Sequence, residues 1–130
     1  MAARRTARER MSTLRILIVD DDEIIGMLLA EMLEDMGHEV CGIETSEAAA
    51  VRAAAKLSPD LIIIDVTLGE GSGVAAVRQI LLSGPVSHLF VSGDLTAVRA
   101  LMPTAAMLHK PYNEAQLVSG MQRAVAEVAP

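Results

Sequence analysis

The arrangement of short apolar runs along the chain constrains its fold more than any other feature of the sequence. Helical stretches separate the runs, and most of the runs end abruptly at a polar residue. Short continuous apolar runs are typical of strands that are covered on both faces of a parallel sheet. The predicted strands are Leu14–Val19, Glu39–Ile43, Leu61–Ile64, Val86–Val91 and Ala105–Leu108.

Between these runs, apolar residues recur at the spacing expected for helices. The first helix is predicted over 23–36, and Gly37 ends it. Its apolar positions are Ile24, Met27, Leu28, Met32 and Met36, with Ile25, Leu29 and Leu33 beside them.

The later helices are predicted from caps and breakers as well as from spacing. Ser46 is a suitable N-cap for an alanine-rich helix that reaches Leu57, and Asn113 is one for the last helix. Pro103 ends a short helix. A helix over Val74–Leu82 follows a loop at Gly69–Gly73, and the apolar face of the last helix consists of Leu117, Val118, Met121, Val125 and Val128.

The regular alternation of strands and helices predicts the α/β class, with a (βα)5 topology. Right-handed crossovers then give a doubly wound, parallel five-stranded sheet with helices on both faces. Such sheets bind ligands beyond the carboxyl ends of their strands, close to the point where the strand order reverses. With the order 2-1-3-4-5, the first and third strands are neighbours at that point.

Charge and composition argue against several classes of partner. The leader at 1–13 carries a net charge of +3, and we expect it to be a disordered, Arg-rich segment; the remainder, 14–130, carries −9. A body of that sign repels nucleic acid, and one Phe, one Tyr and no Trp offer little surface for stacking bases. We therefore expect no nucleic-acid partner.

The sequence also gives no sign of a membrane segment or of an oxidising compartment. No apolar run approaches the ~18–20 residues that a membrane span needs, and no signal-peptide core follows the arginines. The single cysteine, Cys41, excludes an internal disulfide. We expect a cytoplasmic protein without membrane contact.

Polar residues of a particular kind follow the predicted strands. Asp20 and Asp21 follow the first strand, Asp65 the third, Ser92 the fourth and Lys110 the fifth. Carboxylates that converge at one sheet edge repel one another unless a cation joins them, and such oxygen ligands suit Mg²⁺. A carboxylate nucleophile, a divalent metal, a lysine and a hydroxyl are together the groups that phosphoryl transfer requires.

Each of these residues also has a simpler interpretation. Asp20, Asp21 and Asp22 could serve the N-terminus of the first helix, and Asp65 could be an ordinary turn residue. Ser92 precedes a glycine, which is common in turns. The conjunction at four strand ends favours a shared site.

Over residues 14–128 the sequence resembles the receiver domains of two-component response regulators. The resemblance lies in the segments ILIVDDD, LIIIDVTLGEGSG, FVSGD and HKPY. It implies a flavodoxin-like sheet and a phosphohistidine donor on a sensor histidine kinase or a histidine phosphotransfer protein. It also implies the following residue functions: Asp65 as phosphoacceptor, Mg²⁺ held by Asp20, Asp21, Asp65 and the backbone carbonyl of Thr67, and phosphate contacts from Ser92 and Lys110.

Two departures from the family pattern concern signalling. The position three residues before the lysine, where most receivers carry a switch aromatic, is Met107, so a switch based on Ser92 would lack its usual aromatic partner. FVSGD is similar to the Phe-Ala-Thr-Gly run of a subgroup of single-domain receivers, which suggests membership of that subgroup.

We expect no output domain, because the chain stops after its fifth helix. Signalling would then occur through altered protein binding, or the domain would act as a phosphate sink. The main alternative is an aspartate-nucleophile phosphatase of the haloacid-dehalogenase-like kind, which would use Asp20. A third possibility is a receiver that serves only as an interaction module.

Overall fold

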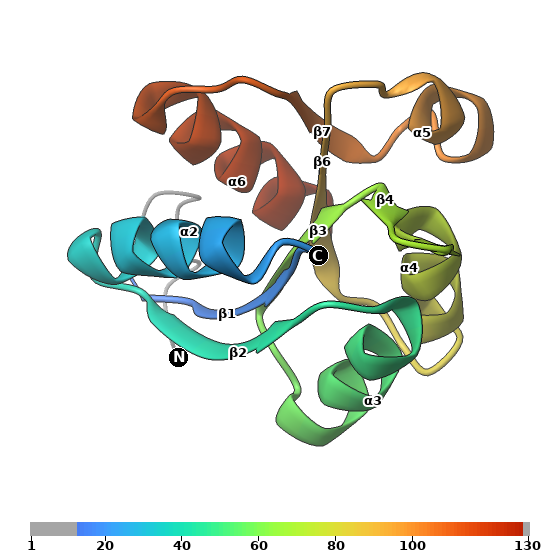
Figure 1. The fold of residues 1–130 in the computed structure, drawn as a ribbon, viewed down its shortest axis with the longest axis horizontal. Coiled ribbons are helices and arrows are strands. Elements are labelled where there is room, and N and C mark those ends of the chain that lie inside the picture. The colour runs from blue at the N-terminus through green and yellow to red at the C-terminus, as the bar shows by residue number, and fades with distance from the viewer. Residues whose placement is uncertain (1–12, 129–130) are drawn as a thin grey trace, which may run out of the picture.

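The computed structural model describes residues 13–128, so the expected leader at 1–13 lies almost wholly outside the described residues (Figure 1). Val128 is also outside the set of residues whose side chains are described. Within the described part of the chain, no helix is long and apolar enough to cross a membrane.

Five parallel strands form the central sheet, and their order is β2-β1-β3-β6-β7. This is the predicted order 2-1-3-4-5, and the α/β fold is confirmed. Each strand differs from its predicted bounds by no more than a residue or two. The strands are β1 (Arg15–Val19), β2 (Glu39–Glu44), β3 (Leu61–Asp65), β6 (Ser87–Ser92) and β7 (Ala106–His109).

Helices cover both faces of the sheet (Figure 1). On one face, α2 (Glu23–Asp35) and α6 (Glu114–Val128) pack on side chains that include Ile16 and Ile18 of β1. The other face carries Leu17 of β1, because successive side chains of a strand point to opposite faces. The helices on that face are α3 (Glu47–Leu57), α4 (Gly73–Leu81) and α5 (Thr96–Leu101).

The apolar positions predicted for α2 divide between an exposed and a buried side of the helix. Ile24, Met27 and Leu28 are 69%, 63% and 57% exposed, whereas Leu29 and Leu33 are buried. The reason is Gly26, which lets the helix approach the sheet so closely that a Cβ there would lie 3.0 Å from Cγ2 of Ile43. Apolar residues on both sides of α2 concealed which side faces the core.

The predicted helix caps are present as hydrogen bonds. Ser46 Oγ accepts from the N–H of Ala49 at 3.2 Å. Asn113 and Gln116 each accept the other's backbone N–H at 2.8 Å, which is a capping box. These caps fix where α3 and α6 begin.

The segment after β3 differs from the predicted loop. Thr67–Leu68 (β4) and Gly71–Ser72 (β5) form a small antiparallel hairpin, with Gly69 at φ 59° in its turn. Helix α4 then begins at Gly73, where a Cβ would collide with the carbonyl oxygen of Asp65. The glycine therefore allows α4 to start directly against the end of β3.

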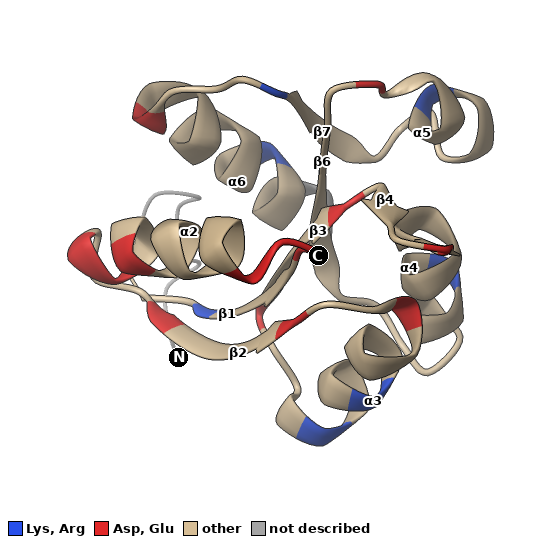
Figure 2. Cartoon of the chain, viewed as in Figure 1, with Lys and Arg blue, Asp and Glu red and all other residues tan. Residues whose placement is uncertain are grey.

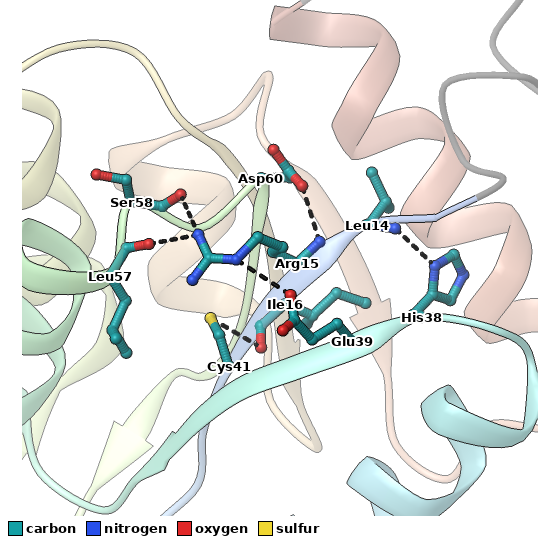
Figure 3. A network of polar contacts seen from close by, with 9 residues as sticks. All are labelled: Leu14, Arg15, Ile16, His38, Glu39, Cys41, Leu57, Ser58 and Asp60. Carbon is teal, nitrogen blue, oxygen red and sulfur yellow. Dashed lines mark hydrogen bonds and ion pairs between the residues drawn. The ribbon is translucent and has the colours of Figure 1, made fainter.

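A polar network lies at the amino ends of β1, β2 and β3 (Figure 3). Arg15 donates from Nη1 to the carbonyl of Leu57 at 2.6 Å and from Nε to Glu39 Oε2 at 3.1 Å. The backbone N–H of Arg15 donates to Asp60 Oδ2 at 2.8 Å. We call these contacts the amino-edge network; it joins the end of α3 to the sheet.

Candidate functional site

Three carboxylates meet at the opposite edge of the sheet. Asp20 and Asp21 follow β1, and Asp65 is the last residue of β3. The two strands are parallel neighbours, with Val19 opposite Ile64, so their carboxyl ends coincide. One oxygen from each of the three carboxylates lies within 4.8 Å of the others. Figure 2 shows these acidic segments between β1 and α2 and at the end of β3.

The acidic triplet divides into residues with different surroundings. Asp22 caps α2, because its Oδ1 accepts the N–H groups of Ile24 and Ile25 at 3.0 and 3.2 Å. Asp20 is buried, and its Oδ1 accepts the N–H of Asp22 at 2.9 Å. Asp21 is exposed. The helix-cap interpretation therefore accounts for Asp22 and leaves the carboxylates of Asp20 and Asp21 beside Asp65.

Lys110 places one positive charge in this cluster. Its Nζ lies 2.9 Å from Asp65 Oδ1 and 3.9 Å from Asp20 Oδ2. Burial acts to lower the pKa of Lys110, but the hydrogen bond and charge of Asp65, together with the charge of Asp20, outweigh it and the pKa is raised. The ammonium group is thus held in its charged form at the centre of the site.

The carboxyl group of Asp65 is the most perturbed of the acids whose shift is resolved. Burial is the main reason that its pKa rises from 3.8 to about 7. The hydrogen bond from Lys110 opposes this rise, while the adjacent Asp20 adds to it. Such a shift is common at functional sites, where carboxylates are brought together without a full set of counter-charges.

Ser92 ends β6, next to the lysine strand, and is linked to the cluster through the backbone. Its carbonyl accepts the N–H of Lys110 at 2.9 Å. Its Oγ accepts the N–H of Asp94 at 3.0 Å, and Asp94 Oδ1 in turn accepts from the N–H and Oγ1 of Thr96 at 3.0 and 2.6 Å. These bonds fix the entry into α5, so Ser92 connects the site to that helix.

The side chains of the other two predicted positions are not members of the charged cluster. Thr67 begins β4 with an exposed side chain, two residues after Asp65. Met107 is half-buried in β7 and packs on the core beneath α3, α4 and α5. The structure therefore brings Asp20, Asp21, Asp65 and Lys110 together, with Ser92 at the adjoining strand end.

The sequence assigned no site function to two residues that contribute to this region. Tyr112 is half-buried and lines a small cavity with Asp20, Asp65 and Lys110; burial is the first cause of its raised pKa. Gly73 supports the backbone of Asp65 from α4, as described above. The Gly-x-Gly spacing before α4 could have indicated that Gly73 has a structural function. The position of Tyr112 after the Lys-Pro pair, by contrast, did not predict that its side chain is partly buried beside the site.

The residues at this edge fit a hard divalent cation. Among the residues that the structure describes, the cluster contains three carboxylates and the ammonium group of Lys110, which leaves it with excess negative charge. Carboxylate oxygens are the ligands that Mg²⁺ and Ca²⁺ prefer, and a cation would lower the repulsion that raises the pKa of Asp65.

Comparison with known proteins agrees with this fold. Residues 16–122 match the family described as the response regulator receiver domain. The chain is 27% identical over 114 residues to the chemotaxis protein CheY of Thermotoga maritima, covering 84% of this chain and 95% of that protein. It is 31% identical over 116 residues to the transcriptional regulatory protein PdtaR of Mycobacterium tuberculosis, covering 86% of this chain and 57% of that protein.

Among solved structures, the solution NMR structure of the Erythrobacter litoralis PhyR response regulator REC domain superimposes with a TM-score of 0.77. It is 27% identical in sequence, and the match covers 93% of this chain and 97% of that one. Other relatives are longer: the chain spans only 27% and 24% of two protein-glutamate methylesterases, from Carboxydothermus hydrogenoformans and Geobacter metallireducens. Since the family match extends over most of the sequence and agrees with the strand order, this chain belongs to the response regulator receiver domain family.

Proposed function

We propose that the chain is a response regulator receiver that accepts a phosphoryl group on the carboxylate of Asp65. The donor would be a phosphohistidine on a sensor histidine kinase or a histidine phosphotransfer protein, in the cytoplasm of a bacterium. One observation carries the proposal: the Asp65 carboxylate lies at the end of β3 beside both Lys110 and the acids that follow β1. We take 14–130 as the receiver unit and 1–13 as a leader outside it.

The proposed metal is Mg²⁺, held by Asp20, Asp21, Asp65 and the backbone carbonyl of Thr67. When bound, it would neutralise charge on the carboxylates and on the phosphoryl oxygens. Only the convergence of the three carboxylates is an observation of the structure. The Thr67 carbonyl and the choice of Mg²⁺ come from the family resemblance.

The chain's own residues would position the transferring group. A carboxylate oxygen of Asp65 forms the new O–P bond while the P–N bond of the phosphohistidine breaks, and that electron pair leaves with the imidazole nitrogen. The Lys110 ammonium neutralises charge on the phosphoryl oxygens, and the Ser92 hydroxyl donates a hydrogen bond to one of them. The domain would thus assist its own phosphorylation and dephosphorylation without being an enzyme for another substrate.

The response to phosphorylation would begin at Ser92. We expect its hydroxyl, which accepts the N–H of Asp94 here, to move toward the phosphoryl oxygen to which it donates and away from that N–H. That movement would release the bonded turn before α5 and alter the surface that a downstream protein binds. Met107 lies in the place of the family's switch aromatic, so the response would not use aromatic rotation there. A phosphate-sink function would require no such surface change.

The experiment that tests the proposal is identification of the acylated aspartate. Incubation with acetyl phosphate and Mg²⁺, followed by borohydride reduction and mass spectrometry, should label Asp65. Asp65→Asn should abolish the label, and chelation of Mg²⁺ in the wild-type protein should prevent it. The matched control, Asp20→Asn, should weaken labelling without moving it.

A label on Asp20 would contradict the proposal and would favour the haloacid-dehalogenase-like phosphatase. The family match gives that alternative no support. If wild-type protein takes no label at all, with Mg²⁺ present, the interaction-module alternative is preferred. Membership of the Phe-Ala-Thr-Gly subgroup stays a prediction.

A further inference from the structure

Glu47, the first residue of α3, reaches across to the hairpin that follows the phosphoacceptor strand. Its Oε1 accepts the backbone N–H of Ser72, in β5, at 2.8 Å. Gly71 makes this approach possible: a Cβ at that position would lie 2.9 Å from Cβ of Glu47 and 3.1 Å from its Oε1. The half-buried glutamate and the glycine therefore fit each other closely.

The residue that Glu47 holds is paired with a proposed metal ligand. In the β4–β5 ladder, Ser72 is opposite Thr67 and Gly71 is opposite Leu68. Ser72 also caps α4, with its Oγ accepting the N–H of Ala75 at 3.2 Å. Glu47 is thus linked to the Thr67 backbone through Ser72, which pairs with Thr67 and lies where the hairpin joins α4.

A second carboxylate holds the turn of the same hairpin. Asp21 Oδ2 accepts the N–H of Gly69 at 3.2 Å. Asp21 also belongs to the three-carboxylate cluster, so cation binding competes with this hydrogen bond for its oxygens. Cation binding does not compete with the hydrogen bond between Glu47 and Ser72, because Glu47 is not a member of the cluster.

From these contacts we infer that Glu47 is a positioning residue for the metal site. It keeps the β4–β5 hairpin, and with it the Thr67 backbone, in place when the cation draws Asp21 away from Gly69. The inference rests on the proposed function, because it takes Thr67 as a metal ligand. Glu47 would act through the hairpin alone, without contacting the metal or the phosphoryl group.

The test compares two substitutions that separate the length of the Glu47 side chain from its negative charge. Glu47→Gln keeps an oxygen acceptor at the same distance and removes the charge, whereas Glu47→Asp keeps the charge and shortens the reach. Each protein is titrated with MgCl₂, and the amide signals of Thr67, Gly69 and Ser72 are followed by NMR. Hydrogen exchange of the Ser72 amide, measured in metal-free protein, reports directly on its hydrogen bond to Glu47. Glu70→Gln, at the exposed hairpin turn, is the control for loss of one nearby charge.

We expect Glu47→Asp to weaken Mg²⁺ binding about tenfold, the lower end of the range for residues that support metal ligands. Its Ser72 amide should exchange faster than in the wild-type protein. Glu47→Gln and Glu70→Gln should bind Mg²⁺ as the wild type does. Urea unfolding of each variant checks that the fold is retained.

Wild-type affinity in Glu47→Asp, with faster Ser72 exchange, would overturn the inference and leave the proposed function intact. An equal loss in Glu47→Gln and Glu47→Asp would also overturn it, since charge rather than the hydrogen bond would be responsible. Absence of any Mg²⁺ response in the wild-type protein would instead refute the proposed metal site, and the inference with it.

Discussion

The two edges of the sheet both carry charged side chains, but they differ in how completely those charges are paired. At the amino edge, the Arg15 guanidinium and backbone N–H have acceptors on Glu39, Leu57 and Asp60 (Figure 3). At the carboxyl edge, three carboxylates lie close together, and Lys110 is within ion-pair distance of two of them. Paired polar groups stabilise a fold, whereas a surplus of one charge held in place by the fold is available to bind a ligand.

The difference predicts opposite effects on stability when one charge is removed from each edge. The largest effect is expected for Asp65→Asn in metal-free protein. The folded-state pKa of about 7 exceeds the ordinary 3.8, so Asp65 lowers stability progressively as the pH rises from about 4 through 7. At pH 8 the substitution should raise the free energy of unfolding by about 2–4 kcal/mol.

Urea unfolding with a chelator present, at pH 8 and again near pH 4, measures this effect. The two proteins should differ little at the lower pH, because Asp65 is protonated in the folded state there and the ordinary pKa of 3.8 means that ionisation of the unfolded chain has only begun to favour unfolding. A destabilised Asp65→Asn protein at pH 8 would mean that the carboxyl edge is as well paired as the amino edge.

Removal of the Lys110 ammonium group from the carboxyl edge should act mainly on the rate of phosphorylation. We expect Lys110→Ala to slow phosphorylation of Asp65 by acetyl phosphate by about a hundredfold, a typical cost of losing one group that stabilises transition-state charge. Lys110→Arg is the matched control, which keeps the positive charge. Rates come from quantitative mass spectrometry of the phosphorylated protein. Equal rates in Lys110→Ala and wild type would remove Lys110 from the site.

At the amino edge, Arg15→Ala should lower the free energy of unfolding by about 1–3 kcal/mol, because hydrogen bonds from a charged donor to Leu57, Ser58 and Glu39 are lost. Phosphorylation should proceed at the wild-type rate. Arg15→Met retains most of the side-chain stem and separates packing from hydrogen bonding. A slowed reaction in either variant would show that the two edges are coupled.

The smallest effect is expected for His38, also near the amino edge. Its Nδ1 accepts the N–H of Leu14 at 3.1 Å, and burial lowers its pKa below 6.5. The unfolded chain therefore binds the proton more readily, and His38 reduces stability as the pH falls through about 6.5 and below. His38→Gln should lose less stability than the wild type between about pH 7 and pH 5 in urea unfolding. Parallel pH profiles would contradict this.

The strand order and the meeting of the acids could be predicted because they depend on local patterns. Apolar runs such as Leu61–Ile64 can be satisfied only between two layers of helices, and parallel strands carry their carboxyl ends to one edge. The polar residue after each run is therefore placed by topology alone. The family membership was predicted on the same residues and is confirmed.

Other features depended on contacts between segments far apart in the chain. The buried side of α2 follows from the fit of Gly26 against Ile43, which no local pattern records. Asp20 and Asp22 are both aspartates in one triplet, yet Asp22 serves as a cap and Asp20 joins the cluster. The functions assigned to Asp65, Ser92 and Lys110 stay predictions until the labelling experiments are done.

The sequence by itself determined the sheet, its order and the edge at which the acids gather, because periodicity and strand ends are properties of short segments. Only the tertiary structure decided how those acids are held: the pairing of Lys110 with Asp65, the hairpin after β3 and the contact of Glu47 with Ser72. Hydrogen bonds and close contacts act over about 3 Å, so they depend on how helices and loops settle against the sheet, and the spacing of residues along the chain does not fix that.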